Sequence, residues 1–164
     1  MCSSDLGLLV GMNTAVIRRD VYRSIGGFNE SMRWGEDYDY WLRASRITEM
    51  HSLAATVALY RIHETNTMNN LPPENQLAIL LQSAYARWGN RNPDGNSLSN
   101  RDFQRRIANT YFDHGYSHFW KGGSEIAKTA FWHALWAGDK RGRSLIYLLM
   151  ANLTSLRNFV VSRS

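Results

Sequence analysis

The sequence predicts an α/β segment over residues 7–71, followed by an all-helical tail over residues 72–164. The α/β segment is indicated by two apolar stretches rich in β-branched residues, 7–17 and 54–61, which have the composition of strands. The tail is indicated by long apolar runs that are separated by glycines and opened by a pair of prolines. We therefore expect an α/β piece with a helical extension.

Within the α/β segment, residues 18–24 are predicted to form a short helix that a pair of glycines ends. Residues 28–34 are predicted to be a loop, and residues 37–46 form the most clearly marked helix. Its acidic residues lie in the first turn and its arginines in the last, which suits the helix dipole. Residues 54–61 are predicted to be a strand, and residues 62–71 a polar loop.

The tail begins at Pro72 and Pro73, and proline is tolerated in the first turn of a helix. This helix is predicted to run to Trp88. Residues 90–100 are dense in turn-forming residues and predict a linker. Three further helices are predicted, at residues 101–120, 124–137 and 142–161.

Composition restricts the class of protein. The chain has 164 residues, a hydrophobic content of 44% and a formal charge of +5, which suits a folded protein with anionic partners. Its basic residues are scattered and match no nucleic-acid-binding motif, so nucleic acid is not a predicted partner. Cys2 is the single cysteine, which excludes an intrachain disulfide and a cysteine-based zinc site. No stretch reaches the ~18 apolar residues that span a bilayer. The predicted location is cytoplasmic, with peripheral contact at the inner face of the membrane left open.

Residues 1–6 are expected to be a non-native leader. The letters CSSDL at residues 2–6 are what one reading frame of a common sequencing adapter encodes. The alternative is an ordinary N-terminus that matches by chance, and the genomic sequence upstream of Gly7 would distinguish the two.

Three carboxylates, Glu36, Asp37 and Asp39, lie at the start of the helix predicted at residues 37–46. Helix N-termini favour ionised carboxylates and hold them in fixed directions. A carboxylate fixed where a glycine-containing loop becomes a helix is a reasonable general base. Acids at this position usually cap the helix, and from the residues alone capping is the simpler interpretation. Asp39 can in addition pair with Arg43, four residues later.

Three motifs nevertheless occur in a fixed order: N-x-A-x-x-R-R at residues 13–19, G-G-F-N-E at residues 26–30 and G-E-D-x-D-x-W-L-R at residues 35–43. Together they resemble the second half of the catalytic domain of family 2 glycosyltransferases, which has the GT-A fold. The resemblance covers residues 10–65 and implies that residues 7–71 are the C-terminal part of such a domain. The family more often has Asp than Asn at position 29.

The resemblance implies an inverting transfer of a sugar from a nucleotide-diphospho-sugar donor to a glycan or lipid-linked acceptor, in surface glycan synthesis. Asp37, paired with Glu36, would be the general base that removes the proton from the acceptor hydroxyl. Gly26 and Gly27 would let the backbone approach the donor sugar. Trp34 would either stack on an acceptor sugar or pack in its own loop. Trp41, at helical spacing, is predicted to be a core residue.

A second segment, Y-R-I-H at residues 60–63, resembles the Y-R-x-H segment that ends the catalytic domain in this family. The resemblance implies that His63 helps to hold Mn²⁺ or Mg²⁺ against the donor diphosphate, and that Arg61 neutralises phosphate charge. Imidazole suits manganese better than magnesium. The alternative for His63 is a solvated loop histidine.

The D-x-D motif that binds metal and diphosphate in this family is absent, because the D-Y-D at residues 37–39 lies in the predicted helix. The half of the domain that holds the nucleotide is also missing from the sequence. The isolated chain is therefore expected to be a fragment that neither binds donor tightly nor turns over.

In the tail, small and aromatic residues recur at helical offsets: Gly115, Ser117, His118, Gly122, Ala127, Phe131, Ala134 and Leu135. These offsets resemble a single tetratricopeptide-type hairpin, in which glycine allows close helix approach. An ordinary antiparallel helix pair is the alternative. His114, with His118 and His133, lacks the spacing of a metal site. The helix predicted at residues 142–161 either packs in the core or lies on an acidic membrane surface.

The sequence thus leaves two functions from different classes. One is a fragment of an inverting glycosyltransferase. The other is a helical scaffold or partner-binding module without catalysis. An upstream segment rich in strands and ending in D-x-D would support the enzyme, whereas further helical repeats would support the scaffold.

Overall fold

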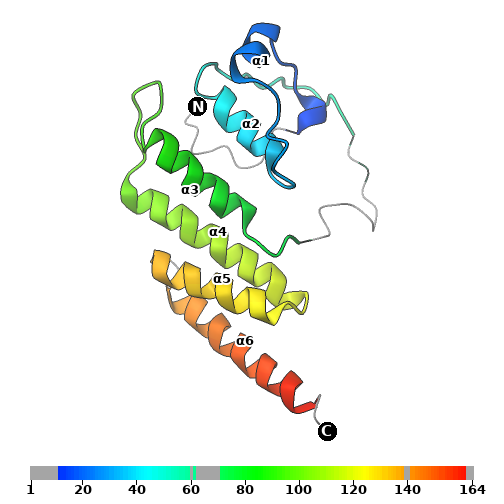
Figure 1. Cartoon of the computed structure of the whole chain (residues 1–164), viewed down its shortest axis with the longest axis vertical. Helices are drawn as coiled ribbons and strands as arrows, with labels where there is room; N and C mark the ends of the chain where they lie inside the picture. The colour runs from blue at the N-terminus through cyan, green and yellow to red at the C-terminus, as the bar shows by residue number, and fades with distance from the viewer. Residues whose placement is uncertain (1–10, 60, 62–70, 139–140, 162–164) are drawn as a thin grey trace. The chain divides into compact units, whose positions relative to one another are not determined.

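The computed structural model describes residues 11–59, 61, 71–138 and 141–161, with side chains in the last helix described as far as Leu153. The first part of the chain contains the 3-10 helix η2 (Met12–Thr14) and the helices α1 (Arg19–Ile25) and α2 (Glu36–Ala44). Four longer helices follow (Figure 1): α3 (Gln76–Trp88), α4 (Asn100–Trp120), α5 (Ser124–Ala137) and α6 (Arg141–Val161).

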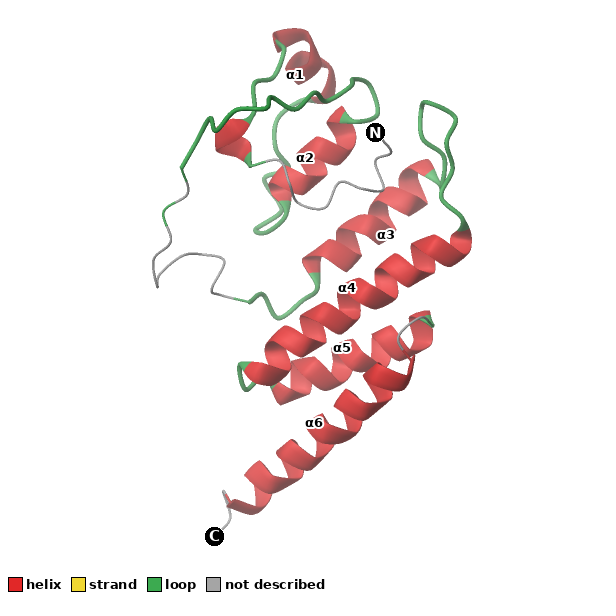
Figure 2. Ribbon diagram, turned by 180° about the vertical axis from the view of Figure 1, so that it is seen from behind, coloured by secondary structure: helices red, strands yellow, loops and turns green. Residues whose placement is uncertain are grey.

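The α/β class predicted for residues 7–71 is wrong, because the residues that the structure describes form helices and irregular segments without a strand or a sheet (Figure 2). Residues 54–59, predicted as a strand, are irregular, and Val57 and Leu59 are exposed. Of the predicted strand 7–17, residues 12–14 form η2, and residues 7–10 lie outside the described residues.

The physical reason is that a strand needs a partner. A segment with high β-propensity becomes a strand only when a neighbouring strand completes its backbone hydrogen bonds. In the described part of the chain, β-type pairing is limited to an isolated antiparallel bridge between Arg91 and Ser97. Residues 54–59 therefore have the composition of a strand without a strand to pair with.

The predicted helices are confirmed. The short helix at residues 18–24, the helix at residues 37–46 and the helix that runs to Trp88 correspond to α1, α2 and α3. The three helices of the tail correspond to α4, α5 and α6. The signals that predict them are local, and Gly26 illustrates one. It follows α1 with φ 77°, a conformation that favours glycine, and its N–H donates to the carbonyl of Tyr22 at 2.9 Å.

The chain divides into two compact units: Met1–Asn69 with Ser83–Leu98, and Asn70–Gln82 with Ser99–Ser164. In the first unit the core is formed by the inner face of α2. Tyr40, Trp41 and Ala44 are buried, which confirms the prediction for Trp41. Partly buried side chains from segments before and after α2 in the sequence pack on this face: Met12, Ala15, Ile17, Ile25 and Met50. This packing holds the start of α2 in a fixed place within the unit.

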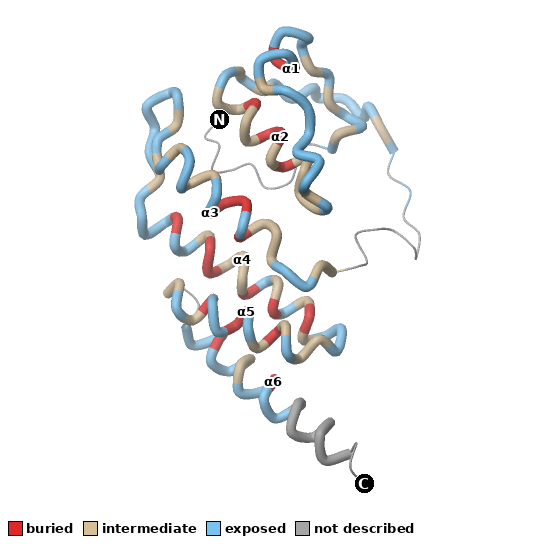
Figure 3. Tube along the Cα trace, in the orientation of Figure 1, coloured by how far each residue is buried: buried red, intermediate tan, exposed pale blue. Residues whose placement is uncertain are grey.

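In the second unit, α4, α5 and α6 pack in succession, and both ribbon views show α5 between α4 and α6. The core consists of Phe112, Ala127, Phe131 and Ala134. The Phe131 ring is fully buried, with its centroid 5.6 Å from that of Phe112 and 5.4 Å from that of Tyr147 on α6. The tube coloured by burial (Figure 3) shows buried positions recurring along α4 and α5. None of the described helices combines the length and the apolarity that a bilayer crossing requires.

Gly115 lets α4 and α5 approach closely, as its position in the predicted hairpin implies. A Cβ at this buried position would lie 3.0 Å from two ring atoms of Phe131 and 3.1 Å from Cβ of Ala130. Such distances are shorter than ordinary carbon contacts, so a larger residue would push the two helices apart.

We expect Gly115→Ala to lower the free energy of unfolding by about 1–3 kcal/mol, even though alanine is the better helix former. Gly142 in α6 is the matched control. A Cβ there meets nothing within 4 Å, so Gly142→Ala should be neutral or stabilise by about 0.4–1 kcal/mol. Urea denaturation followed by circular dichroism measures both variants. Equal stability of the two would contradict the close contact between α4 and α5.

Candidate functional site

The carboxylates singled out in the sequence lie at the start of α2, as predicted. Glu36 and Asp37 are half-buried in the first turn, directly after Gly35. Oδ1 of Asp37 accepts a hydrogen bond from the backbone N–H of Tyr38 at 2.7 Å. The first N–H groups of a helix have no partner within the helix, so this contact both caps α2 and fixes the direction of the carboxylate.

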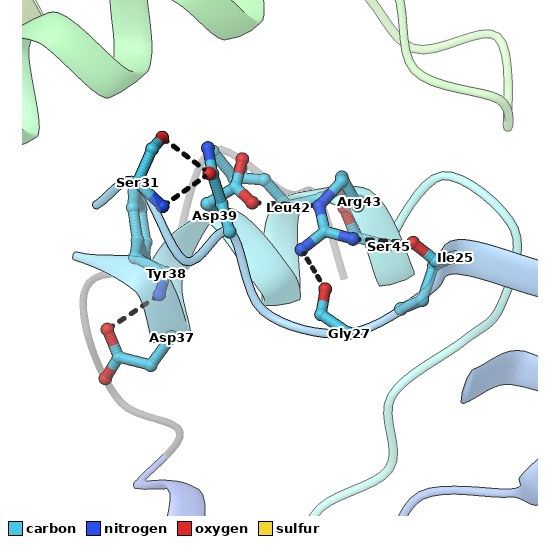
Figure 4. A network of polar contacts seen from close by, with 10 residues as sticks. Ile25, Gly27, Ser31, Asp37, Tyr38, Asp39, Leu42, Arg43 and Ser45 are labelled. Carbon is cyan, nitrogen blue, oxygen red and sulfur yellow. Dashed lines mark hydrogen bonds and ion pairs between the residues drawn. The ribbon is translucent and has the colours of Figure 1, made fainter. Parts of the chain in front are cut away.

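Arg43 joins α2 to the glycine loop that follows α1. Its Nε donates to Oδ2 of Asp39 at 2.8 Å, which confirms the predicted pair. Its Nη1 donates to the carbonyl of Ile25 at 2.6 Å, and its Nη2 to the carbonyl of Gly27 at 2.9 Å. Figure 4 shows the guanidinium between Asp39 and these carbonyls, with Asp37 at the other end of the helix. One side chain therefore ties the loop to the helix that carries the carboxylates.

Aromatic rings also pack against the loop and against Arg43. The Tyr40 ring lies 4.9 Å from that of Phe28 in the loop, and the guanidinium carbon of Arg43 lies 5.4 Å from its centroid. Burial raises the pKa of the Tyr40 hydroxyl, while the nearby positive charge of Arg43 opposes the shift. This hydroxyl is buried and has no hydrogen-bond partner among the residues that the structure describes. The loop is thus held by packing as well as by the arginine.

The other predicted site residues are only partly brought together. Gly26 and Gly27 are exposed in the loop held by Arg43, and Asn29 organises the next turn by accepting from the backbone N–H of Ser31 at 3.2 Å. Trp34 is half-buried before α2, and Arg61 is exposed. Their roles toward a substrate stay predictions. His63 lies outside the described residues, and so the metal-binding role implied for it stays a prediction as well.

Arg43→Gln should free the glycine loop. A hydrogen bond from a charged group contributes about 1.5–3 kcal/mol to stability. Glutamine cannot reach Ile25, Gly27 and Asp39 together, so these bonds are lost. We expect amide hydrogen exchange at residues 26–30 to speed up about tenfold or more, because 1.4 kcal/mol corresponds to one factor of ten. Arg18→Gln is the control, since Arg18 is exposed and pairs with Asp20 on the surface. Unchanged exchange in Arg43→Gln would show that packing alone holds the loop.

The second unit contains an open cleft of about 480 Å³ between the segment that leads into α3 and the helices α4 and α5. Ile79, Ile126 and Ala130 supply apolar lining, and Glu74 and Glu125 supply carboxylates. On one wall the ring of Tyr111 stacks on that of His133 at 4.8 Å. Burial raises the pKa of the Tyr111 hydroxyl. Sequence reasoning missed this cleft because its lining comes from segments that no spacing rule connects.

The tail histidines have structural partners. Nε2 of His114 lies 3.3 Å from the carbonyl of Pro73, and Nε2 of His118 lies 2.9 Å from that of Pro72. Burial lowers the pKa of His114, the Pro73 carbonyl opposes the shift and His118 adds to it. Across the described ranges, no three His, Cys, Asp or Glu side chains are grouped so that they could hold a metal ion. The two imidazoles instead fasten the entry of α3 to α4.

Sequence reasoning also missed the contacts of Arg43 with the carbonyls of Ile25 and Gly27, which lie 18 and 16 residues away along the chain. The one available signal was the arginine four residues after Asp39, and it predicted only the ion pair. Comparison of the chain with models of protein families, with curated proteins and with solved structures found no match.

Proposed function

We propose that residues 13–43 form the acceptor side of an inverting, family 2 type glycosyltransferase site, with Asp37 as the general base. In this proposal the 164-residue chain is a piece of a longer enzyme whose other part holds the nucleotide. The donor is a nucleotide-diphospho-sugar and the acceptor is a hydroxyl of a glycan or of a lipid-linked sugar. The isolated chain is expected to be inactive.

The observation that carries the proposal is the geometry of Asp37 and the glycine loop. Asp37 is oriented by the backbone N–H of Tyr38, is half-buried and therefore remains accessible to a substrate. The same helix holds the Gly26-Gly27 loop through Arg43. The proposed transfer needs a base beside the acceptor hydroxyl and a backbone that can approach the donor sugar closely. Here α2 carries the base and also holds the glycine loop. The order of the three motifs over residues 13–43 supports the same assignment.

In the proposed reaction, the Asp37 carboxylate takes the proton of the acceptor hydroxyl. The acceptor oxygen forms a bond to the anomeric carbon on the face opposite the leaving group. The bond between that carbon and the phosphate oxygen breaks, and its electron pair leaves with the nucleoside diphosphate. General base catalysis of this kind contributes about 10²–10⁴-fold to the rate. Attack from the opposite face inverts the anomeric configuration.

A metal is implied only by the resemblance. Mn²⁺ or Mg²⁺ would neutralise the donor diphosphate, with His63 as one ligand. His63 lies outside the described residues, and the described residues offer no ligand group of their own. No step of the proposal therefore runs through a metal.

The stereochemistry of the product tests the proposal. The full-length protein is incubated with nucleotide sugars and acceptor glycans, and the anomeric coupling constant of the product is measured by NMR. The proposal expects transfer with inversion. Transfer with retention would require a different arrangement of groups and would overturn the role of Asp37. Absence of transfer from every common nucleotide sugar to every acceptor class would overturn the enzyme assignment itself.

A further inference from the structure

Helix α6 presents an apolar stripe to solvent. Its exposed side chains are Leu145 at 47%, Ile146 at 58%, Leu149 at 57%, Met150 at 40% and Leu153 at 67%. At 100° per residue these positions cover an arc of about 140°. The opposite face carries the residues that pack on α4 and α5, including Ser144 and Ala151, both fully buried. Helix α6 therefore has apolar residues both on the face that packs on its neighbours and on the face that is exposed to solvent.

A contiguous stripe of this kind differs from ordinary surface composition. Single exposed leucines are common in folded proteins and need no explanation. Five large apolar side chains on one face of one helix form a patch, and such patches mark contact sites for a partner or a membrane. The burial view (Figure 3) shows the exposed positions recurring along the described part of α6.

The charges around the stripe indicate what it contacts. Arg141 and Arg143 are exposed at the start of α6, and the helical period places them on opposite edges of the stripe. Arg143 also lies over the Phe112 ring, with its guanidinium carbon 5.0 Å from the centroid. From Lys140 to the last residue the sequence contains no acidic residue. Helix α6 itself therefore carries basic side chains and no carboxylate.

We propose that α6 binds the surface of an anionic phospholipid bilayer and lies in the plane of the interface. The stripe would enter the boundary between headgroups and acyl chains, and the two arginines would extend to lipid phosphates. Negative surface potential attracts basic residues that flank such a helix. No described helix has the length and apolarity to cross a bilayer, so the contact is with the surface.

A second copy of the chain fits the face less well. In a pair of α6 helices, neither helix would carry a carboxylate to pair with the basic residues of the other. An anionic bilayer offers an apolar region to the stripe and phosphate groups to the arginines at both of its edges. The inference rests on α6 alone and is independent of the catalytic assignment.

Vesicle sedimentation of the 164-residue chain tests the proposal. We expect the chain to pellet with phosphatidylglycerol vesicles, and to bind phosphatidylcholine vesicles about tenfold or more weakly, because the basic residues lose their partners. Leu149→Glu should abolish pelleting with phosphatidylglycerol. Leu53→Glu is the matched control, since Leu53 is 78% exposed outside α6 and the change in net charge is identical. The control should pellet like the wild type. Circular dichroism checks that both variants keep their helices.

Equal pelleting of Leu149→Glu and Leu53→Glu would overturn the proposal, because binding would then follow net charge and not the stripe. Equal binding to the two lipids would overturn the role of the arginines. A concentration-dependent dimer that Leu149→Glu dissociates, without vesicle binding by the wild type, would assign the face to a second copy of the chain.

Discussion

Under the proposed function, Asp37→Asn in the full-length protein is expected to lower kcat for sugar transfer by about 10²–10⁴-fold, with little change in the KM for the donor. Asparagine has nearly the same shape, and its side-chain oxygen can still accept from the N–H of Tyr38. The substitution therefore removes the basic carboxylate while keeping the contact that caps α2. Initial rates over a range of donor and acceptor concentrations separate the two parameters.

Asp20→Asn is the control for this experiment. Asp20 occupies the first turn of α1 as Asp37 occupies the first turn of α2, but it is exposed and pairs with Arg18. Its replacement should leave transfer unchanged. If Asp37→Asn also retained full turnover, the carboxylate would be a helix cap only, which is the interpretation that the residues alone favoured.

Phe131→Ala should lower the free energy of unfolding by about 3–5 kcal/mol, the largest stability effect that we expect from a single substitution in this chain. The Phe131 ring is fully buried and lies where α4, α5 and α6 meet, in contact with Phe112, Tyr147 and Gly115. Its truncation removes apolar area and leaves a cavity that the neighbouring helices cannot fill without moving. Urea denaturation with circular dichroism at the helical signal gives the value.

Trp136→Ala is the matched control on the same helix. Trp136 is 72% exposed and contacts Trp132 at 5.9 Å between ring centroids. Its loss should cost less than about 1 kcal/mol, as for surface substitutions in general. A similar loss in both variants would mean that the core of the second unit is not centred on Phe131.

The sequence predicted the helices well because their signals are local. The acids and the arginine of α2 and the glycines after α1 and α5 mark helix ends within a few residues. The apolar period of the tail then identifies which faces pack. In particular, Gly115 was expected to allow close approach, and its contact with Phe131 agrees.

The strand predictions were wrong because a strand depends on pairing with residues far away in the sequence, which local composition does not reveal. Residues 54–59 have the composition of a strand, yet Leu59 is 90% exposed and the segment pairs with nothing in the described part of the chain. β-propensity describes how well a side chain fits a pleated surface and does not supply that surface.

The candidate site was predicted in part for the same reason. The position of Glu36 and Asp37 at the start of a helix was predicted because helix N-termini favour carboxylates, whereas their catalytic role was implied only by the resemblance and stays a proposal. The contacts of Arg43 with Ile25 and Gly27 were missed, because no spacing rule predicts a contact between a helix and a loop that lie 16 to 18 residues apart in the sequence. The last helix was predicted either to pack in the core or to lie on an acidic membrane surface. One face of α6 packs on α5, and a membrane contact of its exposed face stays a proposal.

The proposed role of Asp37 is tested most directly by a structure of the full-length protein with an unreactive donor analogue and its acceptor. A general base must lie within about 2.6–3.2 Å of the oxygen whose proton it removes. We expect an Asp37 carboxylate oxygen at that distance from the acceptor hydroxyl, with the Gly26-Gly27 loop against the donor sugar. An acceptor hydroxyl held by a different carboxylate, with Asp37 remote from both substrates, would contradict the account.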